Sequence, residues 1–162
     1  MTDREVHGKV TKWLNTLTGV TVIKDHEGKQ RPALPYIMVN FTTRRKVRER
    51  PQTVLYAGDT QVEATPVLEV EWMFSVHGYA DRAPTDLLRR IVSAAELTQV
   101  TEPLWPDLSI HGVSEIRNVP EWVNEAWEPR AQIDMFVRGL VKDDHEVDVI
   151  EQYSFDFERG QN

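Results

Sequence analysis

Cysteine is absent from this 162-residue sequence, and glycine and proline are sparse, with 8 and 9 residues. Without cysteine the chain has no disulfide bond, no thiolate zinc site and no cysteine nucleophile. The composition, 40% hydrophobic and 28% charged, fits neither a disordered nor a collagen-like protein. We expect a single domain over residues 1–162, because a chain of this length buries roughly 70% of its unfolded surface.

Long hydrophobic runs are also missing. The longest uninterrupted ones have four residues, Tyr36 to Val39 and Val54 to Ala57. A membrane helix needs roughly 20 apolar residues, so we expect no membrane association. The first ten residues, charged from Asp3 onward, do not resemble a secretory signal, and we expect the protein to remain in the compartment where it is made.

Charge is unbalanced and unevenly distributed along the chain. The 19 basic and 26 acidic residues give a net charge of −7, which disfavours wrapping by nucleic acid. Residues 44–50 hold five bases and one acid, whereas residues 143–158 hold seven acids and no base. Either segment alone could be a solvated face, but two poles of opposite sign favour docking between copies or partners.

Two segments have the apolar spacing of amphipathic helices, residues 3–18 and 84–97. Thr2 and Glu5 form a capping-box pattern at the start of the first, and Gly19 can end it in a left-handed conformation. Pro84 suits the first turn of the second helix, and Pro103 and Pro106 follow its end.

Strands are predicted at residues 20–24, 36–43, 67–79, 108–116, 130–141 and 147–157. The alternation is strongest in 67–79, where Trp72 and Phe74 share one face and Glu71, Ser75 and His77 the other. Residues 26–29 have turn chemistry, and residues 44–66 are expected to form an extended arm or hairpin. This order of elements predicts an α+β fold with a mainly antiparallel sheet packed with two α-helices.

Motifs for catalysis are absent. The histidines at positions 7, 26, 77, 111 and 145 have no metal-ligand spacing, and no nucleophile elbow or glycine-rich phosphate loop occurs. The cluster around His145, residues 143–146, could bind a cation but is better interpreted as a solvated turn. We assign no metal, cofactor or catalytic residue. A small hydrolase using Asp134, His77 or His111 remains an alternative without a motif.

Three tryptophans, Trp105, Trp122 and Trp127, fall on chain predicted to be irregular, the last two in the connection 120–129. They could cover the sheet or helices, or Trp122 and Trp127 could anchor a protein interface.

Three segments resemble those of the tail terminator (tail completion) proteins of long-tailed bacteriophages. They are Leu34 to Val39, Phe74 to Asp81 leading into the helix at 87–95, and Trp127 to Asp134. The likeness extends over nearly the whole chain and adds a tail-terminator-like fold to the α+β prediction. It implies a non-enzymatic virion protein, assembled in the host cytoplasm, located at the head-proximal end of the tail.

The resemblance further implies a homo-oligomeric ring, typically a hexamer, that stops polymerisation of the tail tube and offers a surface for head-tail joining. Its partners would be the tail tube protein and the head-tail connector protein, and DNA would pass through without specific binding. Six copies would carry 6 × (−7) = −42 charges, which could repel passing DNA from the bore. The candidate interface residues are Arg44, Arg45, Lys46, Arg48, Arg50, Trp122, Trp127, Asp143, Asp144 and Glu146.

Two other functions remain open. A head-tail connector or head completion protein would have a similar size and also form rings. A nucleic-acid-binding module could use the basic segment 44–50 with Tyr36, Phe41 and Tyr56, although the net negative charge argues against it.

Overall fold

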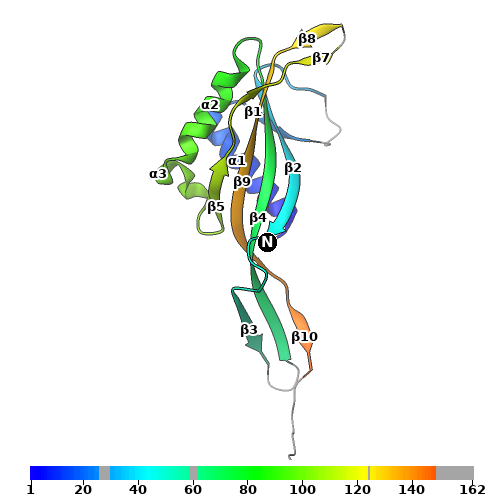
Figure 1. Cartoon of the computed structure of the whole chain (residues 1–162), viewed down its shortest axis with the longest axis vertical. Helices are drawn as coiled ribbons and strands as arrows, with labels where there is room; N and C mark the ends of the chain where they lie inside the picture. The colour runs from blue at the N-terminus through cyan, green and yellow to red at the C-terminus, as the bar shows by residue number, and fades with distance from the viewer. Residues whose placement is uncertain (26–29, 59–61, 124, 149–162) are drawn as a thin grey trace, which may run out of the picture.

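The computed structural model describes residues 1–25, 30–58, 62–123 and 125–148. In these ranges the elements are α1 (Asp3–Thr18), β1 (Thr21–Lys24), β2 (Tyr36–Lys46), β3 (Thr53–Ala57), β4 (Val62–Tyr79), α2 (Pro84–Ala95), α3 (Thr98–Thr101), a 3-10 turn η1 (Glu102–Leu104), β5 (Leu108–Val113), β6 (Arg117–Asn118), β7 (Glu121–Val123), β8 (Ala126–Glu128), β9 (Arg130–Lys142) and β10 (His145–Val147). The helices lie against one face of a long twisted sheet (Figure 1).

The main sheet has the strand order β1-β2-β4-β9-β5. Among the described strands, β1 and β2 form the parallel pair, and the other pairings are antiparallel. The predicted α+β fold with a mainly antiparallel sheet is therefore confirmed. Short helical turns, α3 and η1, follow α2 where the sequence indicated only a stop.

Helix α1 begins and ends as its sequence predicts. The Thr2 hydroxyl accepts a hydrogen bond from the Glu5 amide at 3.3 Å, and the Glu5 carboxylate accepts one from the Thr2 amide at 2.7 Å. Gly19 ends the helix with a φ of 72°, a left-handed conformation that glycine adopts without steric cost. The stripe of apolar residues between these caps faces the sheet.

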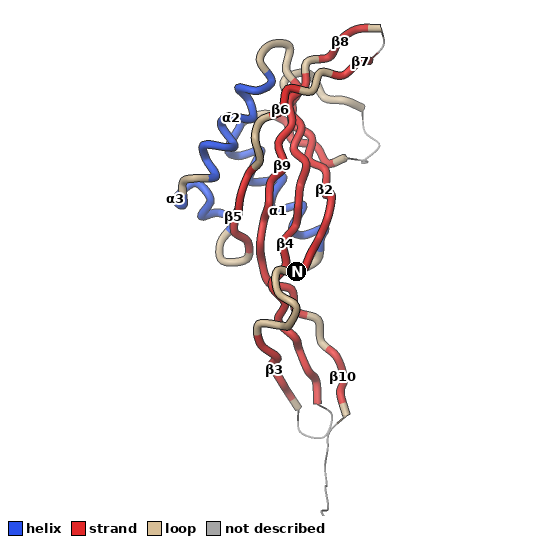
Figure 2. Tube along the Cα trace, in the orientation of Figure 1, coloured by secondary structure: helices blue, strands red, loops and turns tan. Residues whose placement is uncertain are grey.

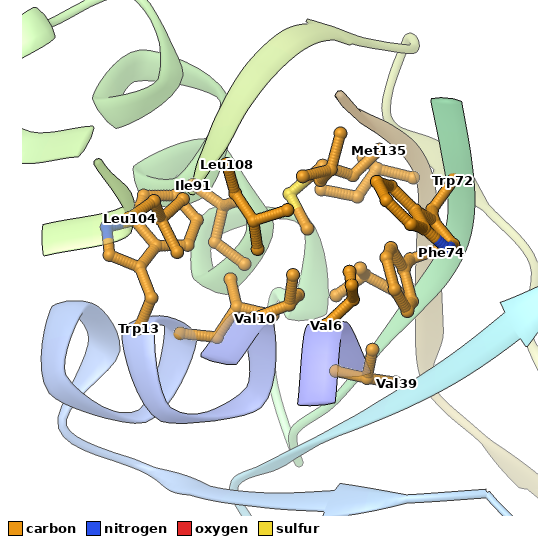
Figure 3. Packing of buried hydrophobic residues seen from close by; sticks show 14 of the residues in the cluster. Val6, Val10, Trp13, Val39, Trp72, Phe74, Ile91, Leu104, Leu108 and Met135 are labelled. Atoms are coloured by element: carbon orange, nitrogen blue, oxygen red, sulfur yellow. The ribbon is translucent and has the colours of Figure 1, made fainter. Parts of the chain in front are cut away.

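The core lies between the helices and the helix-facing side of β4 and β9 (Figure 3). Trp72 and Phe74 on β4 meet Met135 on β9 and Val6 and Val10 on α1, all fully buried apolar side chains. Burying each such side chain stabilises the folded state by roughly 1.5–3 kcal/mol. The buried indole of Trp72 also donates a hydrogen bond from Nε1 to the Asp3 carboxylate at 2.8 Å, which fixes the first turn of α1 against β4.

An arm extends beyond this core (Figure 2). We use the term for β3, the first part of β4 (residues 62–67) and β10, because β4 is paired on one side by β3 and on the other by β10. β4 starts five residues before its predicted beginning, and β2 continues three residues beyond its predicted end, to Lys46. The predicted turn 26–29 and most of the predicted strand 147–157 lie outside the described residues.

Candidate assembly surfaces

The basic segment 44–50 is partly committed to ion pairs within the chain. Arg44 contacts Asp3 at 3.2 Å, Arg45 contacts Glu71 at 2.6 Å and Arg48 contacts Glu69 at 3.3 Å. Arg44 and Arg45 are paired in register with Trp72 and Glu71 of β4. The first three residues of the segment continue β2, which ends at Lys46. Lys46 and Arg50 have no ion pair within the described ranges.

Glu71 is the most buried charged group in this region, with 2% of its surface exposed. Burial alone would raise the pKa of its carboxyl group, but hydrogen bonds from Arg138 and Arg45, both at 2.8 Å, outweigh that effect and lower the pKa below the usual 4.5. Arg45, Glu71 and Arg138 form one row across β2, β4 and β9, on the face away from the helices.

Replacing Glu71 by glutamine (Glu71→Gln) should destabilise the fold by about 1–3 kcal/mol at pH 7, because two arginines then lose a charged partner. A lowered folded-state pKa means that the unfolded chain takes up the proton first. The difference between wild type and variant should therefore be full above pH 4.5 and shrink as the pH falls below it. Urea unfolding at pH 7 and pH 4 measures this, with the exposed acid Glu63 on β4 as the control (Glu63→Gln). A difference that does not change with pH would contradict this role.

The candidate acids Asp143, Asp144 and Glu146 lie at the opposite edge of the arm. Asp143 and Asp144 connect β9 to β10, which carries Glu146. The Asp144 carboxylate accepts a hydrogen bond from the Thr65 hydroxyl at 2.5 Å, and none of the three forms an ion pair in the part of the chain that the structure describes. The basic segment 44–50 therefore lies on the β2–β3 side of β4 and the acids on its β9–β10 side, and we call these two sides, with the flanking charges, the basic and the acidic edge of the arm (Figure 1).

These edges flank the same stretch of β4. Gln52, which follows the basic segment, donates its amide to the carbonyl of Val67 at 2.8 Å, and Val67 is also the register partner of Lys142. Lys46 is the register partner of Val70, and Asp143 follows Lys142, the partner of Val67, so these two charges lie within a few residues of each other along β4.

Trp122 and Trp127 form a second candidate surface, at the far end of the molecule from the arm (Figure 1). The predicted irregular connection folds as the hairpin β7–β8, in which the two tryptophans are direct partners. Their rings meet edge to face with centroids 5.2 Å apart, and 58% and 66% of their surfaces remain exposed. They contact each other and do not cover the sheet or the helices.

Ion pairs connect the base of this hairpin to the rest of the protein. Arg31 contacts Glu128 at 2.5 Å and lies over the ring of Tyr79, with its Cζ atom 5.9 Å from the centroid. Arg130 contacts Glu121 at 3.2 Å and donates to the carbonyl of Val119 at 3.1 Å. The aromatic pair is therefore presented on a fixed support, which reduces the entropy lost when a partner binds.

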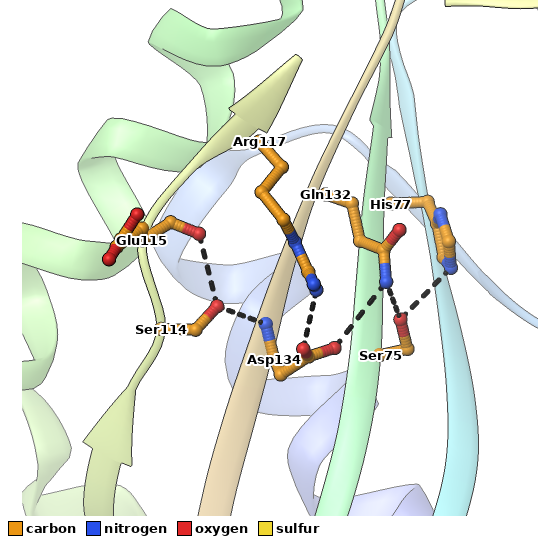
Figure 4. A network of polar contacts seen from close by, with 7 residues as sticks. All are labelled: Ser75, His77, Ser114, Glu115, Arg117, Gln132 and Asp134. Carbon is orange, nitrogen blue, oxygen red and sulfur yellow. Dashed lines mark hydrogen bonds and ion pairs between the residues drawn. The ribbon is translucent and has the colours of Figure 1, made fainter. Parts of the chain in front are cut away.

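A polar network crosses the face of the sheet away from the helices (Figure 4). The hydroxyl of Ser75 lies 3.1 Å from Nε2 of His77 and accepts a hydrogen bond from Gln132 at 2.8 Å. Asp134 binds Arg117 at 2.5 Å. Sequence reasoning placed Ser75 and His77 on one face but did not identify their neighbours, which come from β9 and β6.

This network does not have the geometry of a nucleophilic site. Asp134 is engaged by Arg117 and does not orient His77, whose Nδ1 has no partner among the described residues. Burial and the charge of Arg130 lower the pKa of His77, and the Ser75 hydroxyl is nearly inaccessible. The third candidate, His111, lies exposed on β5 outside the network. These side chains join β4, β6 and β9 across the sheet.

The described residues form several hollows on the surface. A groove of about 470 Å³ lies beside α1, lined mainly by Lys9, Lys12, Trp13, Val100 and Pro103 without a cluster of acids or histidines. In the ranges given above, no three histidine or carboxylate side chains gather as metal ligands would, and no helix combines the length and hydropathy needed to cross a bilayer.

The three aromatic rings proposed to stack on nucleic-acid bases, those of Tyr36, Phe41 and Tyr56, do not form one exposed surface. Tyr36 is buried and stacked on Tyr79 with centroids 4.6 Å apart, and Phe41 packs against Phe74 at 5.8 Å. Tyr56 is exposed on β3. With three of the basic side chains in internal ion pairs, the structure brings together no platform of cations and free rings here.

The described residues thus form an exposed arm flanked by charged residues at one end of the molecule and an aromatic hairpin at the other. The sequence profile of the phage neck terminator proteins matches residues 8–161. The chain belongs to this family.

The fold agrees with this assignment. A solved structure described as the sheath/tube terminator of PVC, an extracellular contractile injection system, in the extended state, matches 99% of this chain with a TM-score of 0.53 and 9% sequence identity. The chain spans 65% of the length of that protein. A comparison with curated proteins finds no match.

Proposed function

We propose that this protein forms a ring that caps the head-proximal end of the tail tube. Ring closure stops tube polymerisation because the capped end offers no surface on which another tube ring can add. The same ring provides the surface to which the head-tail connector binds. The observation that carries this proposal is the pair of oppositely charged edges on one arm, which suits head-to-tail contact between copies.

Charge is the first element of this contact. Lys46 and Arg50 on one copy face Asp143 and Asp144 on the next, and a hexamer contains six such contacts. Because these side chains are exposed, the contact should weaken as salt is added. The protein makes and breaks no covalent bond, and DNA passes through an acidic bore without specific binding.

The tryptophan hairpin serves a different partner. It lies at the opposite end of the long axis from the arm (Figure 1), so a ring whose axis follows the long axis presents hairpins on one side and arms on the other. Trp122 and Trp127 would then anchor the neighbouring component in the stack, either the tube or the connector.

The alternative function, a head-tail connector or head completion protein, also requires a ring. It is favoured only by the same docking surfaces, and the end of the particle that binds the protein distinguishes the two. Gold-labelled protein should bind the head-proximal end of isolated tails. Binding to isolated heads and not to tails would support the alternative.

A further inference from the structure

Among the described residues, the arm has two strand edges without a partner strand. Within the described residues, β3 and β10 each pair with β4 alone, so their outer N–H and C=O groups are unpaired by any strand. On β3, Leu55 and Tyr56 are 49% and 69% exposed, and Val147 on β10 is also exposed. Edge strands in this state are templates for pairing with another chain.

The sequence of β3 does nothing to prevent such pairing. Thr53–Ala57 contains no charged residue and no proline, the devices with which proteins usually protect an edge. Charged residues flank the two edges instead. Lys46 and Arg50 precede β3 in the chain. Asp143 and Asp144 precede β10, which carries Glu146. A strand of opposite charge is attracted, and one of like charge is repelled.

The register brings the two edges to the same height. Tyr56 and His145 are both partners of Ala64, and Ala57 and Glu146 are both partners of Glu63. Since β3 and β10 are each antiparallel to β4, they run in the same direction. Rotation of one copy about an axis parallel to the arm therefore places its β10 beside the β3 of a neighbour as a parallel pair.

We propose that β3 of one copy pairs in parallel with β10 of the next, with Tyr56 level with His145. The occupant of each edge is thus a second copy of this chain. This inference rests on the proposed ring and specifies its contact: the arms join into one belt of strands. Each copy uses one edge of each kind, so the closed ring leaves no arm edge free, whereas every open oligomer leaves two.

Engineered disulfides test this directly, because the chain has no cysteine of its own. The variant Tyr56→Cys/His145→Cys places two thiols on the same face of neighbouring strands, which lie roughly 4.8 Å apart, within reach of a disulfide. After oxidation, a denaturing gel without reductant should show a ladder that ends at the closed ring and collapses to monomer with reductant. Ala57→Cys/Glu146→Cys, one residue further along, should give the same ladder.

Two controls define specificity. Tyr56→Cys/Glu146→Cys is out of register, with side chains on opposite faces, and Tyr56→Cys/Ser93→Cys pairs the arm with an exposed position on α2; neither should give a ladder. Equal ladders from controls and test pairs would overturn the proposal. Rings of native mass that give no ladder with either in-register pair would overturn the strand pairing but leave the ring intact. A wild-type protein that stays monomeric would refute the ring itself.

Discussion

Reversing the charge of one arm edge should abolish ring formation, and reversing both should restore it. In Lys46→Glu/Arg50→Glu both edges of the arm are acidic, and in Asp143→Lys/Asp144→Lys both are basic. Either variant places like charges at every contact between copies, and we expect its association constant per contact to fall at least about tenfold. The four-fold variant again has edges of opposite sign and should form rings.

Mixing the two reversed variants gives a sharper result. An all-acidic arm can only join an all-basic one, so a 1:1 mixture should form rings in which the variants alternate. Alternation is complete only with an even number of copies, such as six. Light scattering at low salt measures the mass of each sample.

The control for this experiment is Arg89→Glu/Arg90→Glu, which makes the same change in net charge as Lys46→Glu/Arg50→Glu but on the exposed face of α2. It should form rings as the wild type does. Variants at Arg44, Arg45 or Arg48 are less informative, because those side chains bind Asp3, Glu71 and Glu69 and their loss would also affect the fold. Rings formed equally well by all the charge variants would show that the arm edges do not form the contact.

Removing the tryptophan pair should reduce the joining of heads to tails without preventing ring formation. The two indoles are largely exposed and contact each other, so Trp122→Ala/Trp127→Ala should cost only about 1 kcal/mol of folding stability. Exposed aromatic anchors typically contribute 2 kcal/mol or more to an interface, which corresponds to a loss of affinity of about 30-fold. We therefore expect intact rings and at least about tenfold fewer joined heads and tails.

Electron micrographs of particles assembled with the variant as the only form of this protein give the fraction of tails that are joined to heads. Trp105→Ala is the matched control, because Trp105 is also exposed but lies next to η1, away from the hairpin. It should join heads and tails normally. Normal joining by the double variant, or loss of the ring itself, would contradict the role given to the hairpin.

The sequence was sufficient to predict the local elements of the fold. The caps of α1 act between residues three apart, and the alternation in β4 identifies Trp72 and Phe74 as core residues without knowledge of the partner strands. The resemblance to tail terminators was also correct. Three segments of ordinary residues carried it, none of which forms an active site.

The assembly surfaces could be predicted only in part. Periodicity assigns a side chain to a face but does not identify its neighbour across the sheet. The ion pair of Arg45 with Glu71 was therefore missed, and so was the continuation of β2 to Lys46 at the start of the segment expected to form an extended arm or hairpin. For the same reason, the sequence could not show that Arg50 and Asp143 flank a single strand, or that Trp122 and Trp127 are partners in a hairpin.

The native mass of the purified protein at low and moderate salt tests the central claim most directly. We predict a closed ring at low salt, which for a hexamer is six times 18.8 kDa, about 113 kDa, with dissociation toward the 18.8 kDa monomer as salt screens the arm edges. A monomer at every salt concentration, or open chains of increasing length instead of one closed species, would contradict a protein that terminates the tail by closing a ring.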